Sequence, residues 1–261
     1  MPDIDLHQLG VLVTRPAHQA EGLCHRIEQA NGQVARLPLI EIAPPGDESA
    51  ARQRLESLAS FDIVIFISAN AVHRCYLYIG KDWPSGPRIA CVGQGSARQL
   101  EADFGRYADL LPESGYDSES LLAMSELHEL AGKKILILKG EGGRQLLAET
   151  LADRGADVSY ANLYRRQLPA EAGQQLNEIQ GRDSIDVVVF TSGEAIHNLL
   201  SLLDETSKTW LCQKTWLVIH PRLADIARQM ACDNEIIISD GPGDEQIVQC
   251  LKQWALQRIK T

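Results

Sequence analysis

Short apolar runs rich in valine and isoleucine recur along the chain, separated by polar turns. The runs are continuous rather than alternating, which is typical of strands buried on both faces in a parallel sheet. Each of the first six is followed by a small or polar turn and then by a segment with helical spacing of its apolar residues. Strand, turn and helix in series predict an α/β fold. The predicted strands are 11–13, 63–67, 89–92, 135–138, 187–190, 216–219 and 236–238.

The segment after the first run has the spacing of an amphipathic helix. Pro16 suits the first turn, where a missing N–H costs little. Gly32 is expected to end the helix. The apolar stripe between them consists of Ala20, Leu23, Cys24, Ile27 and Ala30.

The two halves of the chain resemble each other. Residues 10–15 align with 134–139, and residues 62–72 align with 186–196, with the same offset of 124 residues. A period this long indicates a duplicated domain, because the repeats of a solenoid run about 20–50 residues. The sequence therefore predicts two similar α/β units. They either follow each other along the chain or exchange segments, and the pattern fits both arrangements.

Polar residues gather in six loops that follow predicted strands. In a parallel sheet, ligands bind at the carboxyl ends of the strands, where helix N-termini favour anions. Helix capping or a tight turn explains any one of these residues alone. Together they favour a site for a polyanion. The candidate binding residues are Thr14, Arg15, Thr191, Ser192, Gly193, Glu194, His220, Pro221 and Arg222 in one unit, and Ser68, Ala69, Asn70, Gly93, Ser96, Lys139, Gly140 and Arg144 in the other.

Composition narrows the class of protein. Hydrophobic residues make up 44% of the 261 residues and charged residues 23%, with a formal net charge of −10. An acidic chain of this kind is a poor binder of nucleic acid or of an anionic membrane. The six widely spread cysteines are expected to be reduced thiols, mostly buried. We expect a soluble, cytoplasmic protein, since neither a signal peptide nor an apolar stretch of about 20 residues is visible. Nothing in the sequence requires more than a monomer.

Motifs for cofactors and metals do not occur. Residues 140–144 follow a predicted strand but do not form GxGxxG, and there is no GxxxxGK[ST] or HExxH pattern. The seven histidines are scattered, and a lone histidine is more often structural than a ligand. We therefore expect neither a cofactor nor a metal.

The order of these pieces resembles the uroporphyrinogen-III synthase family. The resemblance covers nearly the whole chain, and the order and spacing of the motifs are more specific than any one of them. The matching segments are 11–16 (Val-Leu-Val-Thr-Arg-Pro, like the family's first strand and turn), 62–72 (like D-x-hydrophobic-F-T-S-x-x-A-V), 92–97 (like VGxxTA), 112–122 (like the next loop and helix), 163–165 (like the VYR connector) and 190–195 (like the second FTS).

The resemblance implies a fold of two similar parallel-sheet α/β domains with helices on both faces. It implies that the first domain is discontinuous, that a two-stranded connector joins the domains, and that a cleft lies between them. The expected boundaries are 1–36 with 166–261 for the first domain, 40–162 for the second, and 37–39 and 163–165 for the connectors.

The resemblance also implies a reaction. The substrate would be hydroxymethylbilane, a linear tetrapyrrole with eight carboxylates, and the product uroporphyrinogen III. Loss of the terminal hydroxyl as water gives an azafulvene, which is attacked at the substituted carbon of the last ring; a spiro intermediate then recloses with that ring inverted. A transient contact with hydroxymethylbilane synthase is a further expectation.

Such a reaction needs a proton for the leaving hydroxyl and a fixed substrate geometry rather than a nucleophile. Tyr164 is the expected proton donor. Its equivalent 124 residues earlier is Ile40, so the duplicated scaffold does not itself require a phenol. The alternative role for Tyr164 is packing at a hinge with its hydroxyl in water.

The chain departs from the family pattern at a few positions. Ile67 stands where the first FTS has threonine, His220 stands where a glycine is common, and Arg222-Leu223 replaces a threonine-rich pair. Binding by backbone N–H groups would survive these changes, whereas side-chain hydroxyl contacts there would not.

Two other functions fit the same pattern. One is a two-lobed cytosolic protein that binds a small anion without catalysis. The other is a double-Rossmann glycosyltransferase that uses a nucleotide sugar, although such chains are typically longer. Tight, saturable binding of uridine nucleotides would favour the glycosyltransferase.

Overall fold

The computed structural model describes residues 5–115, 117–143, 145–182, 184–229 and 234–259, and it has an α/β fold. The chain divides into two compact units, unit 1 (Met1–Glu41 with Gln167–Thr261) and unit 2 (Ile42–Arg166). All seven predicted strands form, with ends that differ by at most two residues. Continuous apolar runs were therefore a sound guide, because these strands are buried on both faces.

Unit 1 is built on a five-stranded sheet with the order β10-β9-β8-β1-β2. Its described pairings are parallel. In chain order it contains β1 (Gly10–Val13), α1 (Ala17–Gln29), β2 (Gln33–Arg36), α7 (Ala172–Arg182), β8 (Val187–Phe190), α8 (Gly193–Ser201), α9 (Glu205–Cys212), β9 (Thr215–Val218), α10 (Pro221–Arg228), β10 (Ile236–Ile238) and α11 (Asp244–Ile259).

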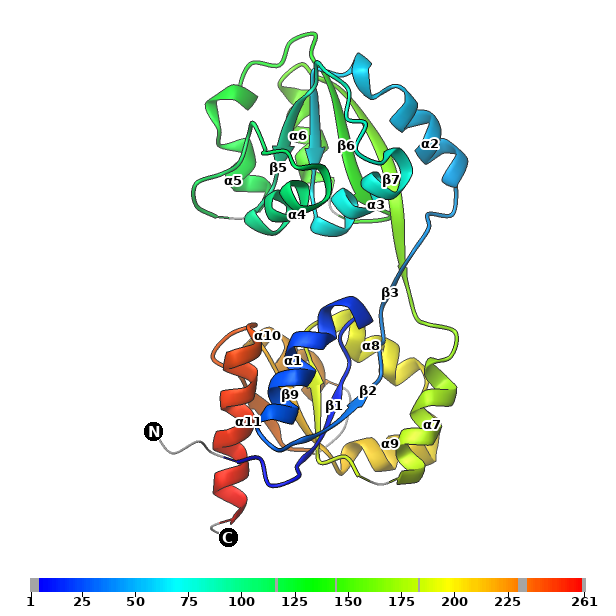
Figure 1. Cartoon of the computed structure of the whole chain (residues 1–261), viewed down its shortest axis with the longest axis vertical. Coiled ribbons are helices and arrows are strands. Elements are labelled where there is room, and N and C mark those ends of the chain that lie inside the picture. Colours follow the sequence, from blue (N-terminus) through cyan, green and yellow to red (C-terminus); the bar gives the residue numbers. More distant parts are fainter. Residues whose placement is uncertain (1–4, 116, 144, 183, 230–233, 260–261) are drawn as a thin grey trace. The chain divides into compact units, whose positions relative to one another are not determined.

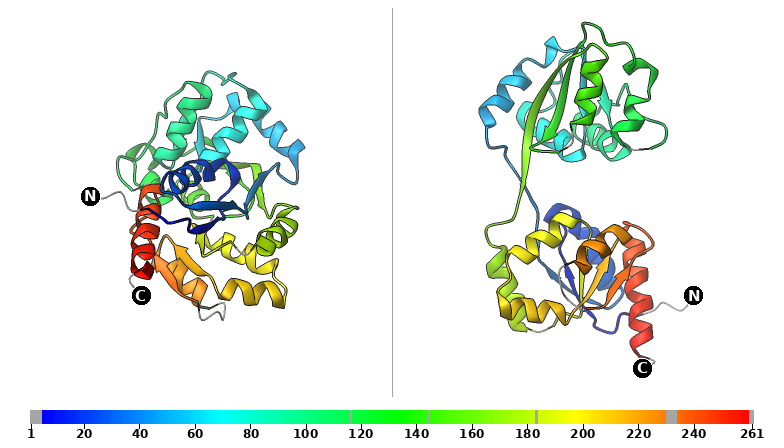
Figure 2. Two further views of the ribbon diagram at one scale, coloured as in Figure 1. Left: turned by 60° about the horizontal axis from the view of Figure 1, so that its bottom comes forward. Right: turned by 180° about the vertical axis from the view of Figure 1, so that it is seen from behind.

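Helices cover both faces of this sheet, as expected (Figure 1). Alternate strand residues enter different cores, because successive side chains of a strand point to opposite faces. Leu12 and Val188 pack with residues of α7, α8, α9 and α10. Val11 and Val187 pack with residues of α1 and α11. Figure 2 shows the same layers from two further directions.

Unit 2 is built on a second five-stranded sheet with the order β3-β7-β6-β4-β5. The pairings from β7 to β5 are parallel. One core packs against α2, α3 and α4, and the other against α5 and α6. The elements are β3 (Glu41–Ala43), α2 (Glu48–Glu56), β4 (Ile63–Phe66), α3 (Ala69–Ile79), β5 (Arg88–Cys91), α4 (Gln94–Phe104), α5 (Ser118–Leu122), β6 (Lys134–Gly140), α6 (Leu146–Asp153) and β7 (Asp157–Gln167), with short 3₁₀ turns at Leu58–Ser60 and Ser125–Leu127.

The duplication is visible in the strand order. Unit 1 contains the series β9-β8-β1-β2, and unit 2 contains β5-β4-β6-β7. An offset of 124 residues carries β1 onto β6 and β8 onto β4 or the reverse, so equivalent strands hold equivalent places. The registers agree as well, since Val13 pairs with Arg36 and Ile137 pairs with Tyr160. The two units are thus similar in topology, and unit 1 consists of two separate segments of the chain with unit 2 between them in sequence.

The segments expected as connectors belong to the cores. Leu37 and Leu39 are fully buried in unit 1. Leu163 and Tyr164 are buried in unit 2. The strands β3 and β7, which are neighbours in one sheet, each include one residue assigned to unit 1.

The end of α1 corrects one expectation. Asn31, not Gly32, takes the left-handed conformation that ends the helix, with φ of 60°. Gly32 N–H bonds to Ile27 O at 2.9 Å and Asn31 N–H to Glu28 O at 2.9 Å, the pattern of a Schellman motif. A Cβ on Gly32 would meet the Ile27 side chain at 2.7 Å. Gly32 is required there for close packing rather than for its φ.

The cysteines match their expected state except at one position. Cys24, Cys75 and Cys91 are buried free thiols, and Cys250 is a half-buried one. Cys212 forms a disulfide, so the expectation of reduced thiols is wrong there. Across the described residues, every helix is too short or too polar to cross a bilayer.

Candidate functional site

Each sheet collects its candidate residues at the carboxyl ends of its strands. In unit 2, Ser68 follows β4, Gly93 follows β5 and Gly140 ends β6. These three strands are parallel neighbours, so their loops lie along one edge of the sheet. The loops after β1, β8 and β9 of unit 1 share an edge for the same reason.

Tyr164 lies in β7 with its hydroxyl against Ser68. The two hydroxyl oxygens are 3.1 Å apart, and either group can donate the hydrogen bond. The phenol ring lies over Gly140, where an added Cβ would come within 2.6 Å of two ring carbons. Tyr164 is only 4% exposed. Packing therefore holds the phenol on the sheet, and the alternative of a hinge residue with its hydroxyl in water does not describe it.

Ser68 is oriented from a second direction. It is the N-cap of α3, and its side chain accepts a hydrogen bond from Ala71 N–H at 3.1 Å. Helix capping alone was a sufficient explanation for this serine in the sequence. The structure shows that one hydroxyl both caps the helix and contacts Tyr164.

A bulge in β7 aims the Tyr164 ring. Lys139 pairs with Asn162, but the next residue of β6, Gly140, pairs with Tyr164, so Leu163 is an extra residue. Successive residues of a strand normally face opposite ways. Here Leu163 and Tyr164 both enter the same core. Such bulges are common next to active sites, where they redirect a side chain.

A cavity of about 380 Å³ opens where α3 and α4 begin. It is lined by the candidate residues Ala69, Gly93 and Ser96, and by Arg98, which the sequence did not single out. Ser96 is 5% exposed, and its hydroxyl has no hydrogen-bond partner within the described part of the chain. The exposed guanidinium of Arg98 makes no ion pair there either. The first residues of two helices, a serine and an arginine therefore line one space, a combination suited to an anion.

The other unit 2 candidates are placed differently. Lys139 lies beside Gly140 on β6 and therefore points to the opposite face from the Tyr164 ring. Its ammonium nitrogen is 5.0 Å from the centre of the Tyr160 ring, and burial lowers the pKa of Lys139. Asn70 lies in the first turn of α3. Arg144 lies outside the described residues.

In unit 1, several candidate side chains serve the sheet and the helix starts. Thr14 is fully buried and donates to Val189 O at 2.7 Å. Ser192 caps α8 by accepting from Ala195 N–H at 3.1 Å. His220 caps α10 by accepting from Arg222 N–H at 3.1 Å. Of the remaining candidates, Thr191 is half-buried after β8, Gly193 and Glu194 open α8, and Pro221 and Arg222 open α10.

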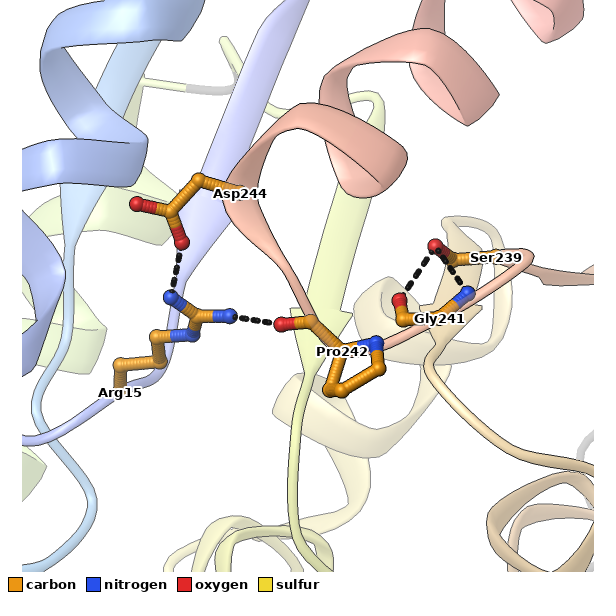
Figure 3. A network of polar contacts seen from close by, with 5 residues as sticks. All are labelled: Arg15, Ser239, Gly241, Pro242 and Asp244. Carbon is orange, nitrogen blue, oxygen red and sulfur yellow. Dashed lines mark hydrogen bonds and ion pairs between the residues drawn. The ribbon is translucent and has the colours of Figure 1, made fainter. Parts of the chain in front are cut away.

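Arg15 is held by groups of its own unit (Figure 3). Its guanidinium contacts Asp244 at 2.5 Å and donates to Pro242 O at 2.9 Å. The Arg15 side chain is 12% exposed and that of Asp244 28%. In the same loop, the Ser239 hydroxyl donates to Gly241 O at 2.7 Å. The structure thus gives Arg15 a counter-ion within the protein, which the sequence pattern did not reveal.

The cysteines next to these loops are not arranged as nucleophiles. Burial raises the pKa of the Cys91 thiol to about 12, and it also raises the pKa of the Cys75 thiol. Thiols in such surroundings are inert. Among the described residues, no group of three or more His, Cys, Asp or Glu side chains could hold a metal ion.

Two important residues were missed from the sequence, Arg98 and Arg74. Arg98 lies in the second turn of α4, and no sequence pattern distinguished it from other exposed arginines. For Arg74, which donates from Nε to Leu163 O at 3.3 Å, no signal was visible, because its partner is a backbone carbonyl at a bulge.

Comparison with known proteins identifies the family of the chain. A sequence model described as "Uroporphyrinogen-III synthase HemD" matches residues 22–249. The chain is 34% identical to a uroporphyrinogen-III synthase of Salmonella typhimurium over 252 residues, which cover 94% of this chain and 100% of the relative. It is 32% identical to that of Escherichia coli over 250 residues, with the same coverage.

Solved structures share the fold. A mutant uroporphyrinogen III synthase of Thermus thermophilus superposes with a TM-score of 0.62 at 18% identity, covering 96% of this chain and 99% of that one. The enzyme of Helicobacter pylori superposes with a TM-score of 0.59 at 16% identity, with the same coverage. At this level of identity the likeness concerns the fold.

Proposed function

The chain belongs to the uroporphyrinogen-III synthase family, and from that premise we propose that it cyclises hydroxymethylbilane to uroporphyrinogen III. It is then an enzyme of tetrapyrrole biosynthesis, and the loss of water makes it a cyclising lyase. The terminal hydroxyl of the linear substrate leaves as water, and the azafulvene methylene that remains bonds to the substituted α-carbon of the last pyrrole to give a spiro intermediate. The bond from that carbon to its original bridge then breaks, and the bridge bonds to the other α-carbon of the ring, which loses a proton, so that the ring is inverted.

The observation that carries the chemical part of the proposal is the contact between Tyr164 and Ser68. A departing hydroxyl needs a proton or a strong hydrogen bond in the transition state. The Tyr164 hydroxyl, 3.1 Å from that of Ser68, lies at the strand edge where ligands bind in parallel sheets. Tyr164 donates its proton to the leaving hydroxyl. Ser68, fixed as the N-cap of α3, orients the phenol and keeps it from turning away.

The substrate's carboxylates bind at the helix starts. In unit 2, the cavity lined by Gly93, Ser96 and Arg98 takes one carboxylate. Arg98 supplies the charge, and the Ser96 hydroxyl and the first N–H groups of α4 supply hydrogen bonds. Ala69 also lines this cavity and directly follows Ser68, so a carboxylate bound there lies near the Tyr164 phenol.

The loops after β1, β8 and β9 supply further contacts in unit 1. Arg222 is exposed at the start of α10 and makes no ion pair within the described residues. The backbone N–H groups at Gly193 and Glu194 are those of a helix start, where anions are favoured. At α10 the helix start forms despite the departures from the family pattern at His220 and Arg222, and the His220 side chain takes up one of its backbone N–H groups by accepting from Arg222 N–H.

The proposal includes a transient contact with hydroxymethylbilane synthase. Free hydroxymethylbilane closes spontaneously to the type I ring, so direct transfer would protect the substrate. The two competing functions, an anion-binding protein without catalysis and a nucleotide-sugar glycosyltransferase, are disfavoured by the family to which the chain belongs.

The test is the identity of the product. Hydroxymethylbilane is generated in place by hydroxymethylbilane synthase, and the cyclised products are oxidised and separated as type I and type III isomers. We expect the type III isomer to dominate when the chain is present, and the type I isomer to dominate without it or with heat-denatured chain. Only type I product in the presence of folded protein would reject the proposed function.

A further inference from the structure

We propose that Arg74 is a positioning residue that holds the bulge of β7 and thereby places the Tyr164 hydroxyl on Ser68. The inference rests on the proposed role of Tyr164. It deepens that role by naming the side chain that positions Tyr164 through a contact with the backbone rather than with the phenol.

The geometry starts from the extra residue of β7. Because Gly140 pairs with Tyr164 while Lys139 pairs with Asn162, the backbone at Leu163 leaves the regular register. Arg74 Nε donates to the Leu163 carbonyl oxygen at 3.3 Å. Leu163 is fully buried, and a buried carbonyl requires a hydrogen-bond partner. The Arg74 side chain therefore stabilises the peptide that directly precedes Tyr164.

Two contacts from one helix then locate the catalytic tyrosine. Ser68 and Arg74 stand at the N-cap and in the second turn of α3, about 9 Å apart along the helix axis. Ser68 contacts the Tyr164 side chain, and Arg74 holds the backbone before it. Because both the hydroxyl of Tyr164 and the backbone before it are held, the ring is fixed over Gly140. Two contacts from one helix to one strand can hold a side chain within about 0.5 Å of its required position.

The Arg74 guanidinium is itself held. Its central carbon lies 5.6 Å from the centre of the Tyr78 ring, and that of Arg52 lies 4.9 Å from the same ring. The two arginines thus share one aromatic partner. They differ in the contact that matters, since Arg52 pairs with Glu48, whereas Arg74 reaches β7. Arg52 is accordingly the matched control for loss of a cation on Tyr78.

Unit 1 provides a second control. Asn198, which is 124 residues after Arg74, donates from Nδ2 to Leu39 O at 2.8 Å, and Leu39 is 124 residues before Leu163. The residue after Leu39 is Ile40, which has no polar group. An equivalent hydrogen bond from a helix side chain to a backbone carbonyl therefore exists where there is no phenol to position. Removing it measures the purely structural contribution of the contact.

The experiment compares Arg74→Met with Arg74→Gln. The glutamine amide nitrogen is bonded to the same carbon position as Arg Nε, so it keeps the donor and loses the cation. The methionine fills the space and loses both. With hydroxymethylbilane as substrate, we expect kcat of the type III reaction to fall about 10- to 100-fold in Arg74→Met, because misplacing a reacting group by about 1 Å costs that much. We expect KM to change less than about threefold and Arg74→Gln to stay within about threefold of the unchanged chain.

A double-mutant cycle separates positioning from general destabilisation. If Arg74 acts through Tyr164, Arg74→Met added to Tyr164→Phe lowers kcat no further. Arg52→Met and Asn198→Leu should leave kcat unchanged. Far-ultraviolet circular dichroism and thermal unfolding select conditions in which each variant is folded. If Arg74→Met does not fold, Arg74→Lys, which keeps a donor but not the planar stack, takes its place with a smaller expected loss.

The outcomes distinguish the two proposals. Equal kcat in Arg74→Met and Arg52→Met, or multiplicative losses in the double mutant, would overturn the role of Arg74 while leaving Tyr164 as the proton donor. An unchanged kcat in Tyr164→Phe would overturn both residue roles. Absence of type III product from the unchanged chain would instead reject the proposed function.

Discussion

Units 1 and 2 share a scaffold and differ at the residues that could do chemistry. In each, a serine caps the helix after the equivalent strand and accepts from a backbone N–H at 3.1 Å. In each, a side chain from that helix holds a buried carbonyl, of Leu163 or of Leu39. The next residue is Tyr164 in one unit and Ile40 in the other. Both units therefore contain the hydrogen bond from the helix to the backbone carbonyl, and only unit 2 has a phenol at the next residue.

The position beneath the ring differs in the same sense. Gly140 in unit 2 leaves room for the Tyr164 ring. Its equivalent in unit 1 is Pro16, at the start of α1. The Tyr164 ring requires a glycine at position 140, because the ring and a Cβ cannot both occupy the same space. The difference teaches that Tyr164 and the glycine that accommodates its ring are both specific to unit 2, whereas the backbone contact beside them exists in both units.

The largest expected effect comes from removing the phenol. Tyr164→Phe keeps the ring over Gly140 and deletes only the hydroxyl, so kcat should fall about 10²- to 10⁴-fold, the usual value of a positioned general acid. Thermal unfolding should be little changed. The matched substitution in unit 1, Ile40→Val, should cost about 0.5–1.5 kcal/mol of stability and leave kcat intact. A Tyr164→Phe variant with full turnover would remove the functional difference between the two units.

Moving the ring should have the next largest effect. In Gly140→Ala, the new Cβ would lie 2.6 Å from two ring carbons, so the phenol must shift away from Ser68. We expect kcat to fall roughly 10- to 100-fold, with KM nearly constant. Gly181→Ala, near the end of α7, is the control, because its Cβ would meet nothing within 4 Å. That variant should be as active as the unchanged chain; equal behaviour of the two alanine variants would show that the ring's place does not matter.

A smaller effect should appear in substrate binding. Arg98→Gln removes the cation of the unit 2 cavity, and we expect KM for hydroxymethylbilane to rise about 10-fold, the value of a hydrogen bond to a charged group. Turnover at saturation should be nearly unchanged. Arg106→Gln removes an exposed cation that does not line the cavity, and so controls for net charge. Equal KM values in the two variants would move the carboxylate site elsewhere, with Arg222 of unit 1 the next candidate.

The sequence predicted the scaffold well, for a physical reason. Strands buried on both faces must be continuously apolar, so runs such as 187–190 identify them, and the offset of 124 residues reveals the repeated order. The candidate loops followed, because ligands bind at the carboxyl edge of parallel strands. Ser68 and Tyr164 were both named in advance, one from a loop and one from a family resemblance.

The contacts inside the site could not be predicted. A bulge at Leu163 is one residue of slippage between two strands, and no local pattern marks it. Without the bulge, Tyr164 would face away from Ser68. Arg74 was missed because it bonds to a backbone carbonyl, which every residue carries. Arg15 was assigned to the substrate because a sequence shows its charge but not Asp244, which is 229 positions away.

The last prediction concerns that arginine and should affect stability more than rate. Asp244→Asn keeps the shape of the side chain and leaves the partly buried Arg15 without its counter-ion, at a cost of about 1–3 kcal/mol in the free energy of unfolding. If Arg15 only secures the start of α11 in unit 1, KM and kcat stay unchanged in this variant, measured alongside chemical unfolding. If instead Arg15 binds a substrate carboxylate and Asp244 competes with it, KM falls in Asp244→Asn and rises in Arg15→Met. The direction of the KM change therefore decides whether Arg15 stabilises the fold or binds the substrate. The same question does not arise for Arg98 in unit 2, because Arg98 has no acidic partner among the described residues.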